Sequence, residues 1–180
     1  MHHWKSDGDI REDPRSGRTF CQVTRKGRDR LQATTMPNAR RVTFARHALG
    51  AIQLHPALRA RSIDALFRQG KYETALRDGS TYLEDAIRAL GGFQNNEVGT
   101  RLCGRAFSAN GPLADPNLVA GERDGWQQLY TAFFGVVRNA VAHRDFQYAS
   151  DKEAFGHLVQ LDLLVEQLDA TAARLGKQLP

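Results

Sequence analysis

The sequence predicts an all-α protein, a helical bundle of four to five helices that follows a short basic N-terminal region. Apolar side chains recur every three or four residues over 71–90, 122–142 and 150–175, which is the periodicity of a helix face. No sheet pattern occurs in the main body of the chain. With 180 residues the chain has the size of one ordinary domain. We therefore divide it into an N-terminal region, 1–40, and a helical domain, 41–180.

The N-terminal region is predicted to hold irregular structure and a β-hairpin-like piece. Residues 1–13 show no periodic apolar pattern and are expected to be irregular. A basic turn then leads into Thr19–Thr24, a short strand-like run. With the following Thr24–Leu31, this order resembles the end of a winged-helix DNA-binding domain. Its recognition helix would have to lie before Met1, so we expect either a remnant of such a domain or a flexible arm, followed by a linker over 34–38.

Two helices are predicted before the first long one. The first covers 42–53, and His55-Pro56 interrupts it because a residue before proline avoids the helical region. Proline suits a first helical position, so the second helix is expected to run from there to about Gln69, with Gly70 as its stop.

A long helix over 71–90 has a continuous apolar face, and Gly91-Gly92 closes the pattern. Gly79 falls on that face, where a bare backbone would permit a neighbouring helix to come close. A shorter helix over 97–107 and a loop over 109–121 follow.

The last two helices carry the clearest patterns. From Trp126 the penultimate helix buries one stripe of bulky side chains, and it is expected to run over 122–142. The final helix begins at Ser150 with Glu153 three residues later, which is the capping-box form.

Charge and composition narrow the classes of function. Residues 1–50 hold 11 Lys and Arg against 5 Asp and Glu, a net of +6, and 51–180 hold 14 against 15, a net of −1. This basic N-terminal part fits either a nucleic-acid contact or a solvated tail. The two cysteines have no metal-ligand spacing, so neither a disulfide framework nor a zinc site is expected. The sequence also has no acid cluster and no Gly-rich phosphate loop, so no metal or cofactor site is expected. No apolar run is long enough to span a membrane and no secretory signal occurs, so we expect a cytoplasmic protein.

Arg138 and His143 are the polar residues at the end of the penultimate helix. Five residues advance an ideal helix by about 500°, which leaves the two positions roughly 140° apart. For both to contact one phosphate, the last turn must unwind near Ala142, or a second subunit must supply the partner group. Asn139, four residues before His143, could orient it. The spacing alone favours a simpler interpretation, in which His143 caps the helix and Arg138 is solvated or paired with an acid.

A wider pattern surrounds this pair. Several short motifs follow one another in a fixed order: Leu54-His55-Pro56, Phe67-x-x-Gly70-Lys71-Tyr72, Leu83-Glu84-x-x-Ile87-Arg88, Cys103-x-x-Ala106-Phe107 and Arg138-Asn139-x-x-x-His143. Together they resemble the Ymh-like branch of the HEPN superfamily, helical domains with an R-x(4 to 6)-H signature. The resemblance covers about residues 54–170. The sequence departs from that branch at Ala140, where proline is usual.

The resemblance implies a metal-independent endoribonuclease that acts as a homodimer in a prokaryotic toxin or phage-defence system, with an antitoxin or another defence component as a possible partner. His143 would move the proton of the ribose 2′-hydroxyl, Arg138 would stabilise charge on the phosphorus, and Asn139 would orient the histidine or a phosphate oxygen. Arg144 would help to hold the RNA, and Glu84 would pair with Arg138 or stay a surface acid near Arg88. DNA is not expected as a substrate because it lacks the 2′-hydroxyl nucleophile.

Two other functions stay open on the sequence. The first is a non-catalytic HEPN module that binds RNA, a nucleotide or a protein while the motif serves the structure. The second is a DNA-binding regulator with a truncated winged helix and the bundle as its dimerisation domain. The remaining histidines, His47, His55 and His157, are scattered singly and are expected to be ordinary surface or capping residues.

Overall fold

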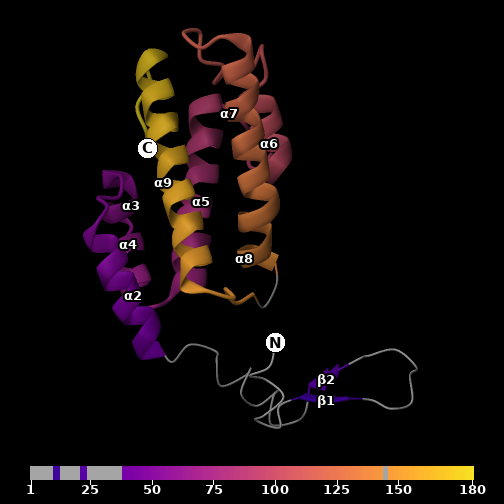
Figure 1. The fold of residues 1–180 in the computed structure, drawn as a ribbon. Helices are drawn as coiled ribbons and strands as arrows, with labels where there is room; N and C mark the ends of the chain where they lie inside the picture. Colours follow the sequence, from indigo (N-terminus) through magenta and orange to yellow (C-terminus); the bar gives the residue numbers. More distant parts are fainter. Residues whose placement is uncertain (1–9, 13–20, 24–37, 144–145) are drawn as a thin grey trace. The chain divides into compact units, whose positions relative to one another are not determined.

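The computed structural model describes residues 10–12, 21–23, 38–143 and 146–180 of the chain. The chain divides into two compact units, Met1–Arg40 and Arg41–Pro180. In the first unit, β1 (Ile10–Glu12) pairs antiparallel with β2 (Cys21–Val23), which are drawn as arrows in Figure 1. β2 lies in the predicted strand. The expectation of irregular structure was wrong for β1, and the predicted basic turn lies outside the described residues. Of the predicted linker over 34–38, only Asn38 is described, and it is the first residue of α2.

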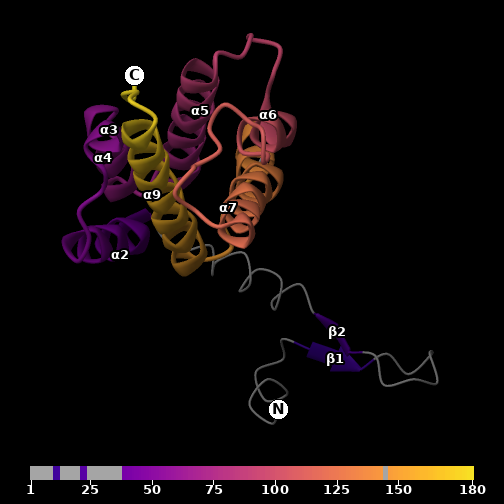
Figure 2. The same cartoon turned by 90° about the horizontal axis from the view of Figure 1, so that it is seen from above.

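The second unit is a bundle of helices, which confirms the all-α class. Its elements are α2 (Asn38–Gly50), α3 (Pro56–Ala60), α4 (Ile63–Arg68), α5 (Tyr72–Gly91), α6 (Gly99–Ala106), α7 (Ala120–Phe133), the π-helix η1 (Phe134–Arg138), α8 (Asn139–His143) and α9 (Asp151–Arg174). α5 and α9 pack together in the middle, with α3 and α4 on one flank and α6 and α7 on the other (Figure 2). The described helices are more numerous than the four to five expected, because the sequence patterns delimit six helical segments and two of these divide into shorter pieces.

The predicted helix from His55 to Gln69 is divided in two. Ser62 has a φ of 60°, in the left-handed region, and this residue separates α3 from α4. The start and the stop of the segment were predicted correctly. The backbone N–H of Ala57 donates to Nδ1 of His55 at 3.2 Å, which caps α3, and Gly70 ends α4 with a φ of 75°.

The core lies along α5 and α9. The apolar stripe predicted for the last helix is buried in α9 at six positions: Ala154, Leu158, Leu161, Val165, Leu168 and Ala172. Its seventh predicted member, Leu175, follows the end of α9 and is partly buried. Gly79 of α5 faces Leu161, and a Cβ placed on this glycine would collide with the leucine side chain. The predicted role of Gly79, a close approach of two helices, is confirmed.

Two further predicted helix ends agree with the structure, whereas the helix expected over 42–53 lies at Asn38–Gly50. Gly92 adopts a φ of 68° at the end of α5, and Ser150 accepts the backbone N–H of Glu153 at 3.1 Å at the start of α9. Among the described residues, no helix combines the length and the apolar character that crossing a membrane requires.

Replacing Gly79 with leucine tests the contact between α5 and α9. The variant is expected to lower the free energy of unfolding by about 2–3 kcal/mol, because an overpacked core costs more than the gain in helix propensity. Gly156→Leu is the matched control, since this glycine of α9 is exposed and has open space around it. Denaturant unfolding should show the control to be neutral or slightly stabilised, and equal losses for the two variants would contradict the packing described.

Candidate functional site

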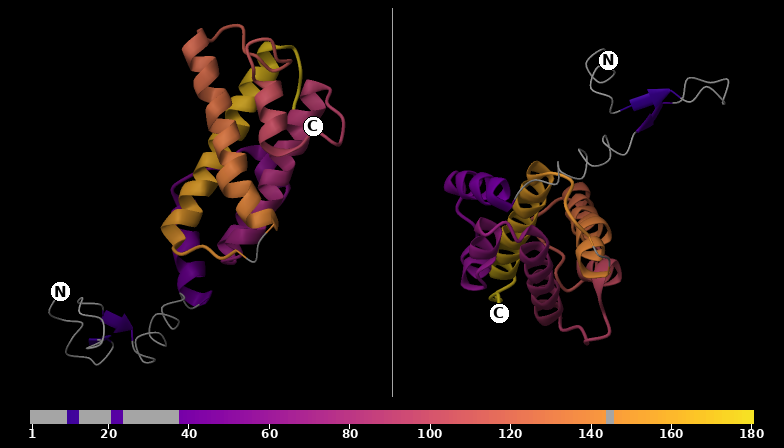
Figure 3. Two further views of the ribbon diagram at one scale, coloured as in Figure 1. Left: turned by 90° about the vertical axis from the view of Figure 1, so that its right-hand side faces the viewer. Right: turned by 90° about the horizontal axis from the view of Figure 1, so that it is seen from below.

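The motif lies at the end of a continuous helical column in the second unit. α7, η1 and α8 follow one another without a gap, and Figure 3 shows them as one continuous column. The sequence predicted this helix over 122–142 but gave no indication of its π-helical turn. In that turn the backbone N–H of Asn139 donates to the carbonyl of Phe134, five residues earlier. Single π-turns within α-helices are frequent at functional sites.

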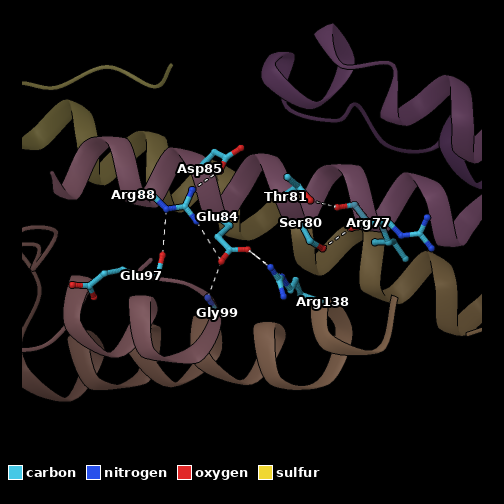
Figure 4. Close-up of polar contacts among 10 residues, drawn as sticks. Arg77, Ser80, Thr81, Glu84, Asp85, Arg88, Glu97, Gly99 and Arg138 are labelled. Carbon is cyan, nitrogen blue, oxygen red and sulfur yellow. Dashed lines mark hydrogen bonds and ion pairs between the residues drawn. The ribbon is translucent and has the colours of Figure 1, made fainter. Parts of the chain in front are cut away.

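Arg138 ends this π-turn and forms an ion pair with Glu84 of α5. The Nε and Nη2 groups of Arg138 donate to Oε2 of Glu84 at 3.0 and 2.8 Å (Figure 4). The carboxylate is buried, with an exposed fraction of 3%, whereas the arginine side chain is 20% exposed. The bond therefore fixes the guanidinium at the edge of the core.

The second oxygen of Glu84 has partners of its own. Oε1 accepts the backbone N–H of Gly99 at 2.8 Å, at the first residue of α6, and lies 3.5 Å from Nη2 of Arg88. Glu84 thus contacts both Arg138 and Arg88, the two partners that the sequence analysis considered. It is a buried residue and not a surface acid. Buried carboxylates need partners of this kind, because an uncompensated charge in the interior is costly.

α5 contributes one further residue to this region that sequence reasoning missed. Nε of Arg77 donates to the carbonyl of Val141 in α8 at 2.8 Å. Arg77 precedes Glu84 by seven residues, so both lie on the same side of α5. The seven-residue spacing could have indicated that Arg77 shares a face of α5 with Glu84. It does not reveal which helix packs against that face.

The backbone bears on the predicted pairing of Arg138 with His143. For Arg138 and His143 of one chain to contact the same phosphate, the last turn would have to unwind near Ala142. It does not unwind, because α8 is α-helical through His143. The two positions therefore stay about 140° apart around the helix axis. Asn139 is exposed. The side chain of His143 and the whole of Arg144 lie outside the described part of the chain.

The structure also shows the surroundings of the other histidines and of Cys103 among the described residues. His55 caps α3, as expected, His47 is exposed, and Nδ1 of His157 lies 3.2 Å from the Tyr148 hydroxyl. Burial raises the pKa of the Cys103 thiol to about 12, which makes it a poor nucleophile. Within the described ranges, no group of three or more His, Cys, Asp or Glu side chains could hold a metal ion.

Removing the Glu84 carboxylate should expose the cost of this buried ion pair. Glu84→Ala leaves Arg138 and the Gly99 N–H without their shared partner, and we expect a loss of about 3 kcal/mol in the free energy of unfolding. Asp85→Ala is the control, because that carboxylate is 61% exposed and its ion pair, within the described part of the chain, is with Arg88. The control should cost less than about 1 kcal/mol in denaturant unfolding. Similar losses for both variants would contradict a buried anchor.

One family model matches the chain, and its description is a protein of unknown function (Hypoth_ymh). No curated protein and no solved structure shows significant similarity to the chain. The match covers residues 52–168, which contain Glu84, Arg138 and the helices that hold them. The chain therefore belongs to the Hypoth_ymh family.

Proposed function

We propose that this protein is a metal-independent endoribonuclease of the HEPN superfamily that cleaves RNA by attack of the ribose 2′-hydroxyl. One observation carries the proposal. An arginine of the R-x(4)-H motif is held at the edge of the core by a buried carboxylate, in a helix whose last described residue is His143.

The geometry at Arg138 suits the stabilisation of developing charge. Two N–H groups bind one oxygen of Glu84, so the plane of the guanidinium is set before substrate arrives. Charged groups that are already oriented cost no reorganisation during the reaction, which makes them effective at a transition state. Lysine would reproduce this role poorly, because its ammonium group has no planar fork.

Besides the charge stabilisation by Arg138, the proposed reaction needs a group that transfers a proton. The imidazole of His143 takes the proton of the 2′-hydroxyl as the oxygen attacks the adjacent phosphorus, and water protonates the leaving 5′-oxygen. In the alternative, protonated His143 gives its proton to the 5′-oxygen and water takes the proton of the 2′-hydroxyl. The new P–O bond closes a 2′,3′-cyclic phosphate, and the broken one leaves a 5′-hydroxyl. A positioned group of this kind contributes typically ~10²–10⁴ in rate.

The separation of Arg138 and His143 around one helix supports a site shared by two chains. Because α8 stays helical through His143, one chain presents the two positions about 140° apart. A homodimer with the two motif helices facing each other across the two-fold axis would bring one chain's arginine to the other chain's histidine. Such a ribonuclease fits a toxin or phage-defence role in the cytoplasm, where an antitoxin or defence component would control it.

A second function is favoured by the same ion pair. Glu84 joins η1 to the start of α6 through Arg138 and Gly99, so the motif arginine also holds the bundle together. A non-catalytic module that binds RNA, a nucleotide or a protein would need the arginine for that purpose alone. The two functions differ in what His143 does.

Cleavage of RNA in the presence of EDTA tests the catalytic proposal. The purified protein is expected to release fragments with 2′,3′-cyclic phosphate ends from bulk transfer RNA, and His143→Ala should lower the rate by at least about 10². His47→Ala, which changes an exposed histidine of α2, should cleave like the unaltered protein. Equal cleavage by the His143→Ala protein with an unchanged circular dichroism spectrum would contradict the assignment and favour the non-catalytic module.

Mixing two inactive variants tests the shared site. Light scattering should give the mass of two 20.1 kDa chains. When Arg138→Met and His143→Ala proteins exchange subunits, roughly a quarter of the activity should return, since half of the dimers are mixed and each has one intact site of two. A monomer at micromolar concentration, or no recovery after verified exchange, would contradict a site built from two chains.

A further inference from the structure

We infer that Arg77 binds a phosphate group of RNA beside the end of α8. The inference rests on the proposed function, and it adds a substrate-binding residue from a helix outside the motif. It begins from the contact between Arg77 and the motif helix, in which Nε donates to the Val141 carbonyl at 2.8 Å.

This contact places the Arg77 guanidinium at the end of the motif helix. Val141 stands two residues before His143, in the last turn of α8. Along α5, Arg77 lies two turns from Glu84, roughly 10.5 Å. Figure 4 shows Arg77 and Glu84 in sequence along this helix, with Arg138 on the neighbouring one. Because Arg138 pairs with Glu84, the two arginines lie at different levels along α5, and we expect them to contact different phosphates of one strand.

The charge on Arg77 is less compensated than that of its neighbours. Arg138 and Arg88 both pair with Glu84, and Arg88 also pairs with Asp85. Among the described residues, no carboxylate forms an ion pair with Arg77. Its side chain is exposed, and it donates a hydrogen bond to the Val141 carbonyl. A guanidinium bound to the protein through Nε can present its Nη groups to a phosphate, the geometry in which arginine binds most strongly.

Capping of α8 is the competing explanation. A cation near the carboxyl end of a helix is stabilised by the helix dipole, and Arg77 would then need no ligand. Capping alone affects stability and leaves the salt dependence of RNA binding unchanged. A phosphate contact changes that dependence, because each neutralised phosphate releases condensed counterions.

The experiment measures how salt affects binding to a short, mixed-sequence, single-stranded 2′-O-methyl RNA, which has no 2′-hydroxyl and cannot be cleaved. With fluorescence anisotropy, Arg77→Gln is expected to weaken binding by about tenfold at low salt. It should also reduce the slope of log K against log salt concentration by about 0.7. Arg59→Gln is the matched control, because it also removes one exposed charge. Arg59 belongs to α3, which lies on the other side of α5 and α9 from α7 (Figures 1 and 2). The control should leave the affinity and the slope nearly unchanged.

The same inference can be tested without any variant, should Arg77→Gln fail to fold. Phenylglyoxal modifies accessible guanidinium groups, and mass spectrometry of the digested protein locates them. The 2′-O-methyl RNA should protect Arg77 from modification and leave Arg59 reactive. Equal modification of Arg77 with and without bound RNA would overturn the inference.

The outcomes separate this inference from the proposed function. A folded Arg77→Gln protein with an unchanged slope and a lower melting temperature would reduce Arg77 to a cap, even if the unaltered protein cleaves RNA. An unaltered protein that binds the probe with the expected slope change at Arg77 but cleaves no RNA would support phosphate binding and contradict the ribonuclease. Failure of the unaltered protein to bind the probe would overturn the assignment of Arg77.

Discussion

The buried carboxylate of Glu84 is the interaction on which the arrangement of the motif depends. It receives two N–H groups from Arg138 and one from the backbone of Gly99, and it lies near Arg88. A charge at this depth is stable only when its partners compensate for lost hydration, so the ends of α6 and η1 are held where they can donate to it. The position of the motif arginine is therefore a property of α5 as much as of its own helix.

Much of the fold could be predicted because its main helices are strongly amphipathic. The stripes of α5 and α9 and the glycine stop at Gly92 follow directly from residue spacing. The break at Ser62 could not be predicted, because serine carries no sequence signal for a left-handed backbone. The π-turn was missed for a similar reason: Phe133, Phe134 and Val137 are all buried, and their spacing is compatible with an α-helix.

The candidate site was predictable only in part. The resemblance to a known family indicated Glu84 as a possible partner of Arg138, and the structure shows their ion pair. The bond from Arg77 to Val141 joins residues 64 apart in the chain, and it depends on how two helices pack. Periodicity reports which face of a helix is buried, but it does not report which residues of two helices lie opposite each other. Contacts of that kind become visible only in three dimensions.

The π-turn at Phe134–Arg138 also affects how related sequences should be compared. A π-turn holds one residue more than an α-turn, so it acts as a one-residue insertion inside a continuous helix. A relative without the extra residue could present its motif at the same angle to α7 with an uninterrupted α-helix, whereas the same insertion in a regular α-helix would rotate the motif by about 100°. Alignments of the family are therefore best anchored separately on the two sides of η1, at Tyr130 in α7 and at Asn139 in α8, with the gap placed between them.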